Sequence, residues 1–304
     1  HSFPTRRSSD LPPADSVVLL GVKGGPAIRP GSAMPTSTLV SLGGRRVLVD
    51  AGLGVSRALV DQGVPLASLE LILITHLHSD HVLELGPLLH TAWTAGLRTP
   101  VRIFGPAGLS ALWEGFLASL RFDIELRIED EGRPDLRDLV SLHPVREGVF
   151  LAEAGLEIAA LPVPHPPAPE AWAFRFDAGG RRVVLSGDCA AHPPLARFAE
   201  GADLLVHEAM LAEGIDALCA RVGNADARLS AHLLRAHTMA EDAARLAAEA
   251  GAKALALNHL IPADDPAFTE GHWRAAVARH YAGPLHVGRD GRVIPLPAAA
   301  PPPS

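Results

Sequence analysis

The segment from Thr75 to His81 holds the residues whose chemical purpose is clearest. Three histidines and one aspartate, His76, His78, Asp80 and His81, fall within six positions. Neutral imidazole nitrogens and a carboxylate oxygen are ligands that zinc and similar first-row ions prefer. Crowding such groups together without a metal would cost solvation and bring no packing in return. The segment therefore predicts a metal site.

Apolar runs of the chain position these residues. The run 69–74 directly before the segment has the length and β-branched content of a buried strand. The histidine cluster should therefore lie where a strand leaves its sheet. His165, Asp188 and His259 each follow a further apolar run in the second half of the chain. We expect all of them at the carboxyl ends of strands, close to the first cluster.

The number of these residues predicts two metal ions. The two predicted ligand sets are His76, His78 and His165 for one ion, and Asp80, His81 and His259 for the other. Asp188 and a water or hydroxide would bridge the ions. Two cations about 3.5–4 Å apart lower the pKa of a bridging water and hold both the attacking and the leaving oxygen. Zinc is the expected ion, and manganese and iron accept the same ligands.

Asp50 ends an earlier apolar run, directly before Ala51 and Gly52. At that place its carboxylate can accept a hydrogen bond from a ligand imidazole. It can equally cap a turn or a helix. The sequence leaves both interpretations open.

Strands and helices are expected to alternate along most of the chain. Expected strands cover 17–20, 38–42, 46–50, 69–74, 101–104, 156–161, 171–176, 182–185, 204–206 and 254–257, and expected helices cover 55–60, 83–95, 109–120, 239–250 and 273–281. Gly43 and Gly44 indicate a hairpin between two of these strands. The charged stretch 127–147 carries no pattern that assigns it.

The composition is that of a globular chain. It has 304 residues, 48% of them hydrophobic, with a net charge of −7 and two cysteines. We expect one domain over 16–297, a non-native or disordered leader over 1–15 and a disordered tail over 298–304. The acidic charge argues against a nucleic-acid partner, and no apolar run reaches the ~20 residues of a membrane span. A cytoplasmic location is expected, or a periplasmic one if a native leader was lost.

The ligand pattern resembles the metallo-β-lactamase superfamily, whose signature is His-x-His-x-Asp-His. The resemblance extends over most of residues 16–297 and includes Leu48-Val49-Asp50-Ala51-Gly52, His165, Ser186-Gly187-Asp188 and His259. It implies an α+β fold, a four-layer αββα sandwich with a dinuclear metal site. It also implies a homodimer.

Two further elements resemble the RNase Z-related branch of this superfamily. His207-Glu208-Ala209-Met210 is similar to a His-Glu-Ala-Thr element, with methionine in the last place, and Ala236-His237-Thr238 is similar to its accompanying histidine element. The resemblance implies that His237 donates a proton or a hydrogen bond to the scissile group and that Glu208 orients it. The alternative is that His237 only begins a helix and Glu208 pairs with a surface cation.

Among members of this branch, the chain looks most like the arylsulfatase-like group. The resembling elements are Leu20-Gly21, Gly24-Gly25-Pro26, Phe104-Gly105-Pro106-Ala107-Gly108 and Val287-Gly288-Arg289-Asp290. The transfer-RNA-processing enzymes of the branch carry a long arm between the third-motif histidine and the bridging aspartate. The interval from His165 to Asp188 has no room for it. A tRNA substrate is therefore disfavoured.

We predict an enzyme that hydrolyses a small ester, an aryl sulfate or a phosphodiester, with the bridging hydroxide as nucleophile. Asp80 would also take up the proton of the water, and Glu208 and His237 would assist the leaving oxygen. A lactonase or β-lactamase-like acyl hydrolase is the alternative, because the same hydroxide can attack a carbonyl. Transfer-RNA 3′-processing and a metal-binding protein without turnover are the remaining interpretations.

Overall fold

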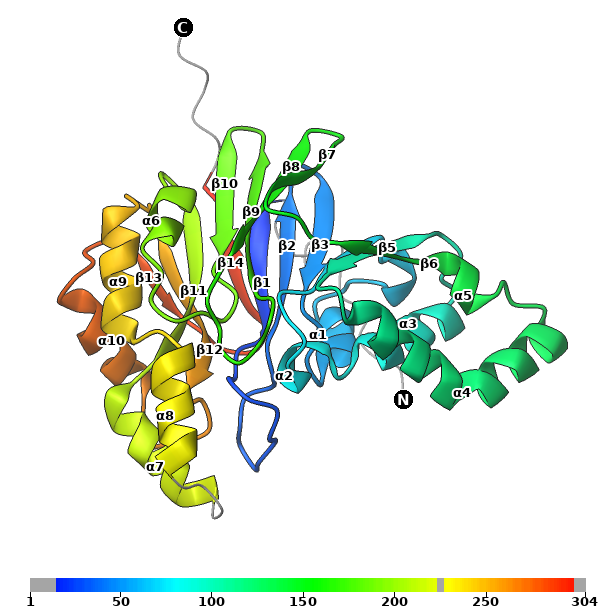
Figure 1. Ribbon diagram of the computed structural model, residues 1–304. Helices are drawn as coiled ribbons and strands as arrows, with labels where there is room; N and C mark the ends of the chain where they lie inside the picture. The colour runs from blue at the N-terminus through cyan, green and yellow to red at the C-terminus, as the bar shows by residue number, and fades with distance from the viewer. Residues whose placement is uncertain (1–14, 223–226, 298–304) are drawn as a thin grey trace, which may run out of the picture.

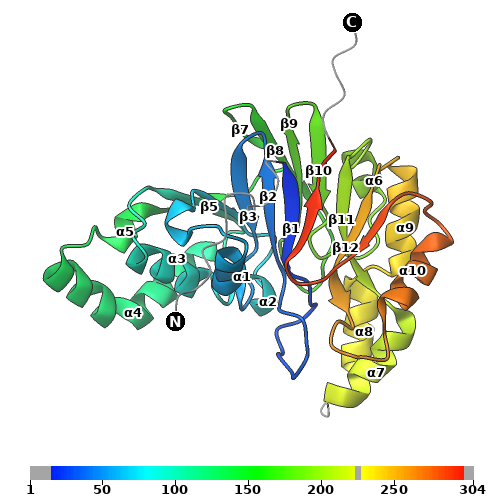
Figure 2. The ribbon, with the colours of Figure 1, turned by 180° about the vertical axis from the view of Figure 1, so that it is seen from behind.

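Two seven-stranded sheets pack face to face, with helices on both outer surfaces (Figures 1 and 2). The computed structural model describes residues 15–222 and 227–297. The predicted αββα sandwich is confirmed. The predicted leader, except Asp15, and the predicted tail 298–304 lie outside the described residues. Among the described residues, none of the helices has the length and apolar character that crossing a membrane requires.

The elements follow one another in the same way in both halves. The first sheet has the order β14 (Arg292–Pro295), β1 (Ser16–Gly21), β2 (Ser37–Leu42), β3 (Arg45–Val49), β4 (Leu71–Leu73), β5 (Val101–Gly105), β6 (Val140–Pro144). The second has the order β13 (Leu285–Val287), β12 (Leu255–Ile261), β11 (Leu204–Met210), β10 (Arg181–Leu185), β9 (Trp172–Ala178), β8 (Leu156–Pro162), β7 (Gly148–Glu153). Antiparallel hairpins thus precede parallel strands in each half.

The helices form the two outer layers and part of one edge (Figure 1). On the first sheet lie α1 (Val55–Asp61), a 3₁₀ turn (Leu66–Ser68), α2 (Ser79–Val82), α3 (Leu85–Thr94), α4 (Leu109–Glu131) and α5 (Leu136–Leu139). On the second lie α6 (Pro194–Phe198), α9 (Ala240–Glu249) and α10 (Glu270–Ala278), while α7 (Ala212–Val222) and α8 (Ala227–Ala236) lie at the edge, beyond the strand ends.

Strand β1 shows why the sheets are covered on both faces. Val17 and Leu19 pack into the core between the two sheets, whereas Val18 and Leu20 pack into the core beneath the helices of the first sheet. Successive side chains of a strand point to opposite faces, so an uninterrupted apolar run is buried on both sides. The strand is fully buried as a result.

The unassigned stretch 127–147 contains the end of α4, all of α5 and β6. Helix α4 extends beyond the predicted boundary at Leu120 because the charges of its last turns pair at helical spacing. Arg127 contacts Asp123 at 2.9 Å and Glu131 at 2.8 Å, each four residues away. Such pairs stabilise a helix without producing an apolar face, so a search for apolar periodicity misses it.

The parallel strands bring their carboxyl ends to one edge of the sandwich. Strands β3 to β6 run parallel in one sheet, and β10 to β13 run parallel in the other. The loop between β1 and β2 projects from this edge together with α7 and α8 (Figures 1 and 2). Loops at this edge therefore surround whatever the strand ends present.

Candidate metal centre

The seven residues predicted as metal ligands lie together at this edge. Their ligating atoms form two groups, each within 4.8 Å, composed of His76, His78 and His165, and of Asp80, His81, Asp188 and His259. These are the two sets expected from the sequence, with the bridging aspartate in the second. All seven side chains are buried except that of His78, which is half-buried.

The first group is made of imidazoles alone. Nε2 of His165 lies 3.0 Å from Nδ1 of His78, and the rings of His76 and His165 are 4.7 Å apart. Burial lowers the pKa of all three histidines, and that of His76 falls well below its ordinary value. The rings are therefore held neutral, which is the form that binds a metal.

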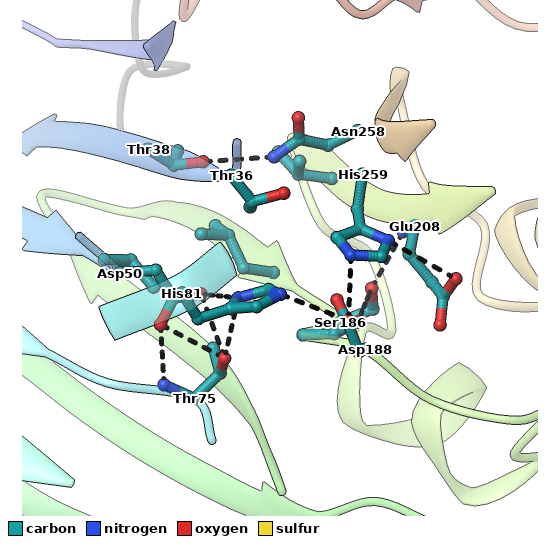
Figure 3. Close-up of a pocket in the computed structure, with 14 residues that line it drawn as sticks. Thr36, Thr38, Asp50, Thr75, His81, Ser186, Asp188, Glu208, Asn258 and His259 are labelled. Carbon is teal, nitrogen blue, oxygen red and sulfur yellow. Dashed lines mark hydrogen bonds and ion pairs between the residues drawn. The ribbon is translucent and has the colours of Figure 1, made fainter. Parts of the chain in front are cut away.

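The second group is a buried cluster of imidazoles and carboxylates. Oδ2 of Asp188 lies 3.0 Å from Nε2 of His259 and 3.2 Å from Nε2 of His81 (Figure 3). Burial disfavours the charge on His259, but the carboxylates of Asp188 and Asp80 outweigh it and raise its pKa to about 10. The same imidazoles hold the pKa of Asp188 well below its usual range, against the effect of burial. These carboxylates thus require positive charge beside them.

Asp188 is placed to contact both groups. Its Oδ2 atom is also 3.7 Å from Nε2 of His76 and 3.9 Å from Nε2 of His165, which belong to the first group. One carboxylate oxygen therefore faces four imidazole nitrogens. The geometry is that of a residue shared between two cation sites.

The atoms around Asp188 fit a pair of divalent ions. Within the described residues, Nε2 of His76 is buried without a hydrogen-bond partner, and the buried Nε2 of His81 approaches Oδ2 of Asp188 at 3.2 Å without the geometry of a hydrogen bond. Buried polar atoms are seldom left in this state unless an ion or another ligand satisfies them. Imidazole nitrogens and carboxylate oxygens are the donor set expected for zinc.

In His81 and His165, the ring nitrogen Nδ1 contacts an oxygen atom outside the two ligand groups. Nδ1 of His81 contacts Oδ2 of Asp50 at 2.8 Å, and Nδ1 of His165 contacts the carbonyl oxygen of Ala236 at 2.8 Å. Asp50 also accepts a hydrogen bond from the backbone N–H of Thr75 at 2.8 Å. Such contacts select the tautomer that leaves Nε2 available to a metal. Of its two interpretations, Asp50 therefore fits the hydrogen-bond acceptor of a ligand imidazole.

Replacing Asp50 by asparagine is expected to weaken zinc binding about 10- to 100-fold, because His81 would lose the carboxylate that orients it. Zinc titration of the metal-free protein, followed by calorimetry, measures this. An Asp130→Asn variant, altered at an exposed position of α4, serves as the control. Native zinc affinity in the Asp50→Asn variant would contradict the assigned role.

His259 does not lie beyond the end of its strand, as the sequence pattern suggested, but inside β12. Strand β12 pairs Asn258 with Glu208 and Leu260 with Ala209, so His259 is the extra residue of a β-bulge. Its backbone adopts a positive φ of 42°. Bulges redirect side chains near functional sites, and this one turns the imidazole towards Asp188. Apolar residues on both sides of the bulge continue the strand to Ile261, whereas the predicted strand ends at residue 257.

Glu208 and His237 meet beside the second group. Nδ1 of His237 lies 2.9 Å from Oε2 of Glu208, while Oε1 accepts the backbone N–H of Cys189 at 2.6 Å. The rings of His237 and His259 stack at 5.3 Å. Burial disfavours the charge on His237, but Glu208 outweighs it and raises its pKa. His237 lies between α8 and α9 without belonging to either helix, and Glu208 is buried rather than paired at the surface.

Some contacts of the site had no clear signal in the sequence. The carbonyl of Ala236 reaches His165 across 71 positions, and the N–H of Gly25 donates to Oδ2 of Asp80 at 2.7 Å. Backbone groups of this kind carry no residue-type signature. Thr75 directly precedes His76 in the sequence, but nothing in the sequence indicates its partner. Its hydroxyl donates a hydrogen bond to Asp50 at 2.9 Å.

A cavity of about 380 Å³ opens onto the cluster. One wall holds His78, His232 and His237, and another holds Lys23 and Arg29 of the loop between β1 and β2. The remaining described wall is apolar and is formed mainly by Leu218, Val222, Leu229, Leu233 and Ile261. A small molecule with both anionic and apolar parts therefore matches the described lining.

The αββα sandwich with a histidine and aspartate cluster at its edge defines a metal-dependent hydrolase of ester bonds with the metallo-β-lactamase fold. Residues 16–254 match the family model described as "Anti-Pycsar protein Apyc1". The chain belongs to this family, in the RNase Z-related branch of the metallo-β-lactamase superfamily.

Known proteins agree with this assignment. The chain is 33% identical over 277 residues to a protein named Ribonuclease Z from Mycobacterium marinum, an alignment that covers 90% of this chain and 96% of the relative. The crystal structure of the metallo-beta-lactamase fold protein YhfI from Bacillus subtilis has a TM-score of 0.67 at 24% identity and covers 91% of this chain and 98% of that one. Zinc-bound PqqB from Methylobacterium extorquens has a TM-score of 0.63 at 20% identity, and the alignment covers 92% of this chain and 100% of PqqB.

These similarities alter two of the expectations. The arylsulfatase-like assignment is not supported, because the curated relatives are named Ribonuclease Z. The same name conflicts with the expected absence of a nucleic-acid partner. The assignment to the RNase Z-related branch is confirmed.

Proposed function

We propose that the protein is a phosphodiesterase with two zinc ions that cleaves small phosphodiesters. The observation that carries this proposal is the Glu208–His237 pair, buried beside two groups of metal ligands on the wall of one cavity. We assign the first ion to His76, His78 and His165, the second to Asp80, His81 and His259, and the bridging position to Asp188. The predicted homodimer stays a prediction.

The side chains divide the chemistry among them. When bound, two divalent ions supply an activated water and neutralise the charge that develops on the phosphate. Asp80 would help to hold the second ion, and its Oδ1 atom would be the one left to accept a proton from a bound water, because Oδ2 already accepts the N–H of Gly25 and contacts His259. His237 gives a proton to the leaving oxygen, and Glu208 holds the ring at Nδ1 so that Nε2 is the donating atom.

The described cavity supports a small anionic substrate. Lys23 and Arg29 lie on one wall, where Arg29 is also paired with Asp264 at 2.7 Å, and the volume of about 380 Å³ lies in the range of small-molecule sites. The apolar wall formed by α7 and α8 would cover the organic part of the ester. Relatives named Ribonuclease Z support phosphorus rather than sulfur at the scissile centre.

Transfer-RNA cleavage is the second candidate, and the similarity to proteins named Ribonuclease Z favours it. Against it, the chain carries a net charge of −7, whereas RNA binding requires several contacts from lysine or arginine to phosphates. Between His165 and Asp188 the structure has only the β9–β10 hairpin. We therefore rank the small phosphodiester first.

A substrate panel tests the proposal. The zinc-loaded protein should hydrolyse bis(p-nitrophenyl) phosphate at least about 10²-fold faster than p-nitrophenyl sulfate, a lactone or nitrocefin. The reason is that the proton donor His237 and two zinc ions suit the leaving oxygen and the charge of a phosphodiester. A chelator should abolish this turnover, and added zinc should restore it. Faster cleavage of the lactone or nitrocefin would replace the proposal with an acyl hydrolase. Cleavage of precursor tRNA at a higher kcat/KM would establish the second candidate.

A further inference from the structure

The loop Lys23–Gly25 joins β1 to the cavity wall, and the proposed chemistry gives it no role beyond charge. Lys23 is only 4% exposed, which is unusual for a lysine. Within residues 15–222 and 227–297, its ammonium forms no ion pair with a carboxylate. Instead, Nζ donates to the carbonyl oxygens of Gly24 at 2.9 Å and Gly25 at 3.0 Å. The side chain thus folds back onto the two residues that follow it.

These two glycines contact two of the residues assigned to the second ion. The N–H of Gly25 donates to Oδ2 of Asp80 at 2.7 Å, and the same oxygen lies 3.2 Å from Nε2 of His259. Gly24 packs against the ring of His259, because a Cβ atom there would lie 2.9 Å from Cε1 and 2.5 Å from Cγ1 of Ile261. The loop therefore rests directly on Asp80 and His259.

Backbone bonds hold this loop up to Gly24, whose N–H donates to the carbonyl oxygen of Leu260 at 3.1 Å, and the Lys23 side chain restrains the next two carbonyls. Two consecutive glycines have wide conformational freedom, and Gly25 adopts a positive φ of 83°. A Gly25 N–H that points elsewhere would leave Oδ2 of Asp80 free to rotate. The Gly24 carbonyl and the Gly25 N–H belong to one planar peptide, so the bond from Lys23 to that carbonyl fixes the direction of the N–H. The second bond holds the carbonyl of the following peptide, between Gly25 and Pro26.

We propose that Lys23 is a positioning residue for the second metal ion, acting through the Gly25 N–H that orients Asp80 and through the contact of Gly24 with His259. This inference rests on the proposed function, because it takes Asp80 and His259 as ligands of the second ion. Groups that orient a ligand from behind typically contribute 10- to 100-fold to metal affinity. Lys23 should do so without contacting the ion.

The test is zinc titration of the metal-free protein by calorimetry, with Lys23→Met as the main variant. The affinity for one of the two ions should fall about 10- to 100-fold, and that for the other should stay within about 3-fold of native. Lys253→Met is the matched control, because Lys253 is the only other lysine in the sequence and pairs with Asp203 at 2.7 Å, away from the cluster. It should bind both ions like the native protein.

Two further variants keep the inference testable if Lys23→Met does not fold. Lys23→Arg keeps a cationic donor and should retain most of the affinity, whereas Gly24→Ala should displace the loop from His259 and weaken the same ion as Lys23→Met. Native affinity for both ions in Lys23→Met, or in Gly24→Ala, would overturn the inference. Native protein that binds fewer than two zinc ions would overturn the ligand assignment and the inference with it. Two bound ions without phosphodiester turnover would overturn only the proposed activity.

Discussion

Replacing Asp188 by asparagine should lower phosphodiester turnover by at least about 10³-fold, the largest effect we expect from any single change. Oδ2 of Asp188 lies within 3.9 Å of ring nitrogens from both ligand groups, so one substitution affects both ions. An amide oxygen is a weaker ligand than a carboxylate and carries no charge to balance the cations. Zinc content should fall together with kcat.

Metal analysis and steady-state kinetics on the same preparation measure both effects. Asp130→Asn removes an exposed carboxylate of α4 and should leave zinc content and kcat at their native values. If Asp188→Asn kept about two zinc ions per chain and native turnover, the bridging assignment would be wrong. If it lost one ion only, Asp188 would belong to a single site.

Replacing His237 by alanine should lower kcat about 10²- to 10³-fold while zinc content stays unchanged. Nδ1 of His237 is occupied by Glu208 at 2.9 Å, and the ring stacks on His259, with a ring nitrogen within 4.8 Å of ligating atoms of His165 and Asp188. We therefore expect its loss to remove a proton donor and to leave the ions in place. Glu208→Gln should give a smaller fall, because the ring is still held by a hydrogen bond.

The dependence on the leaving group separates a proton donor from a structural residue. A p-nitrophenolate leaves without full protonation, whereas an alkoxide does not, so His237→Ala should impair phosphodiesters with alkyl leaving groups more than bis(p-nitrophenyl) phosphate. His90→Ala is the matched control, since His90 pairs with Asp123 at 2.8 Å beneath α4. An equal loss with both leaving groups would argue against proton donation. A loss of zinc would make His237 a metal ligand instead.

Most of the proposed metal ligands could be brought together from the sequence, because their signal is local or topological. His76, His78, Asp80 and His81 are adjacent in the sequence, and a buried strand directly precedes them. The more distant proposed ligands, His165 and Asp188, follow strands whose carboxyl ends share the same edge of the sandwich. Parallel strands with short connections bring such residues together, and the conformation of the loops has little influence on this.

Other features depended on packing between segments far apart in the chain. The pattern placed His259 beyond its strand, but the pairing of β12 with β11 continues past it and forces a bulge. Whether a strand continues depends on its neighbour, which a single apolar run does not reveal. The extension of α4 from the predicted end at Leu120 to Glu131 was not predicted for a related reason, since charge pairs rather than an apolar face hold its last turns.

The types of the proposed ligands, their two sets and the strand ends near them follow from the sequence, because metal coordination demands particular side chains and strands demand apolar runs. The groups that surround these residues follow only from the folded chain. In the folded chain, Asp50 contacts His81, the carbonyl oxygen of Ala236 contacts His165, and the N–H of Gly25 donates to Asp80. Two of these three contacts come from backbone groups, which every residue possesses. Their partners are therefore set by the fold and not by residue type.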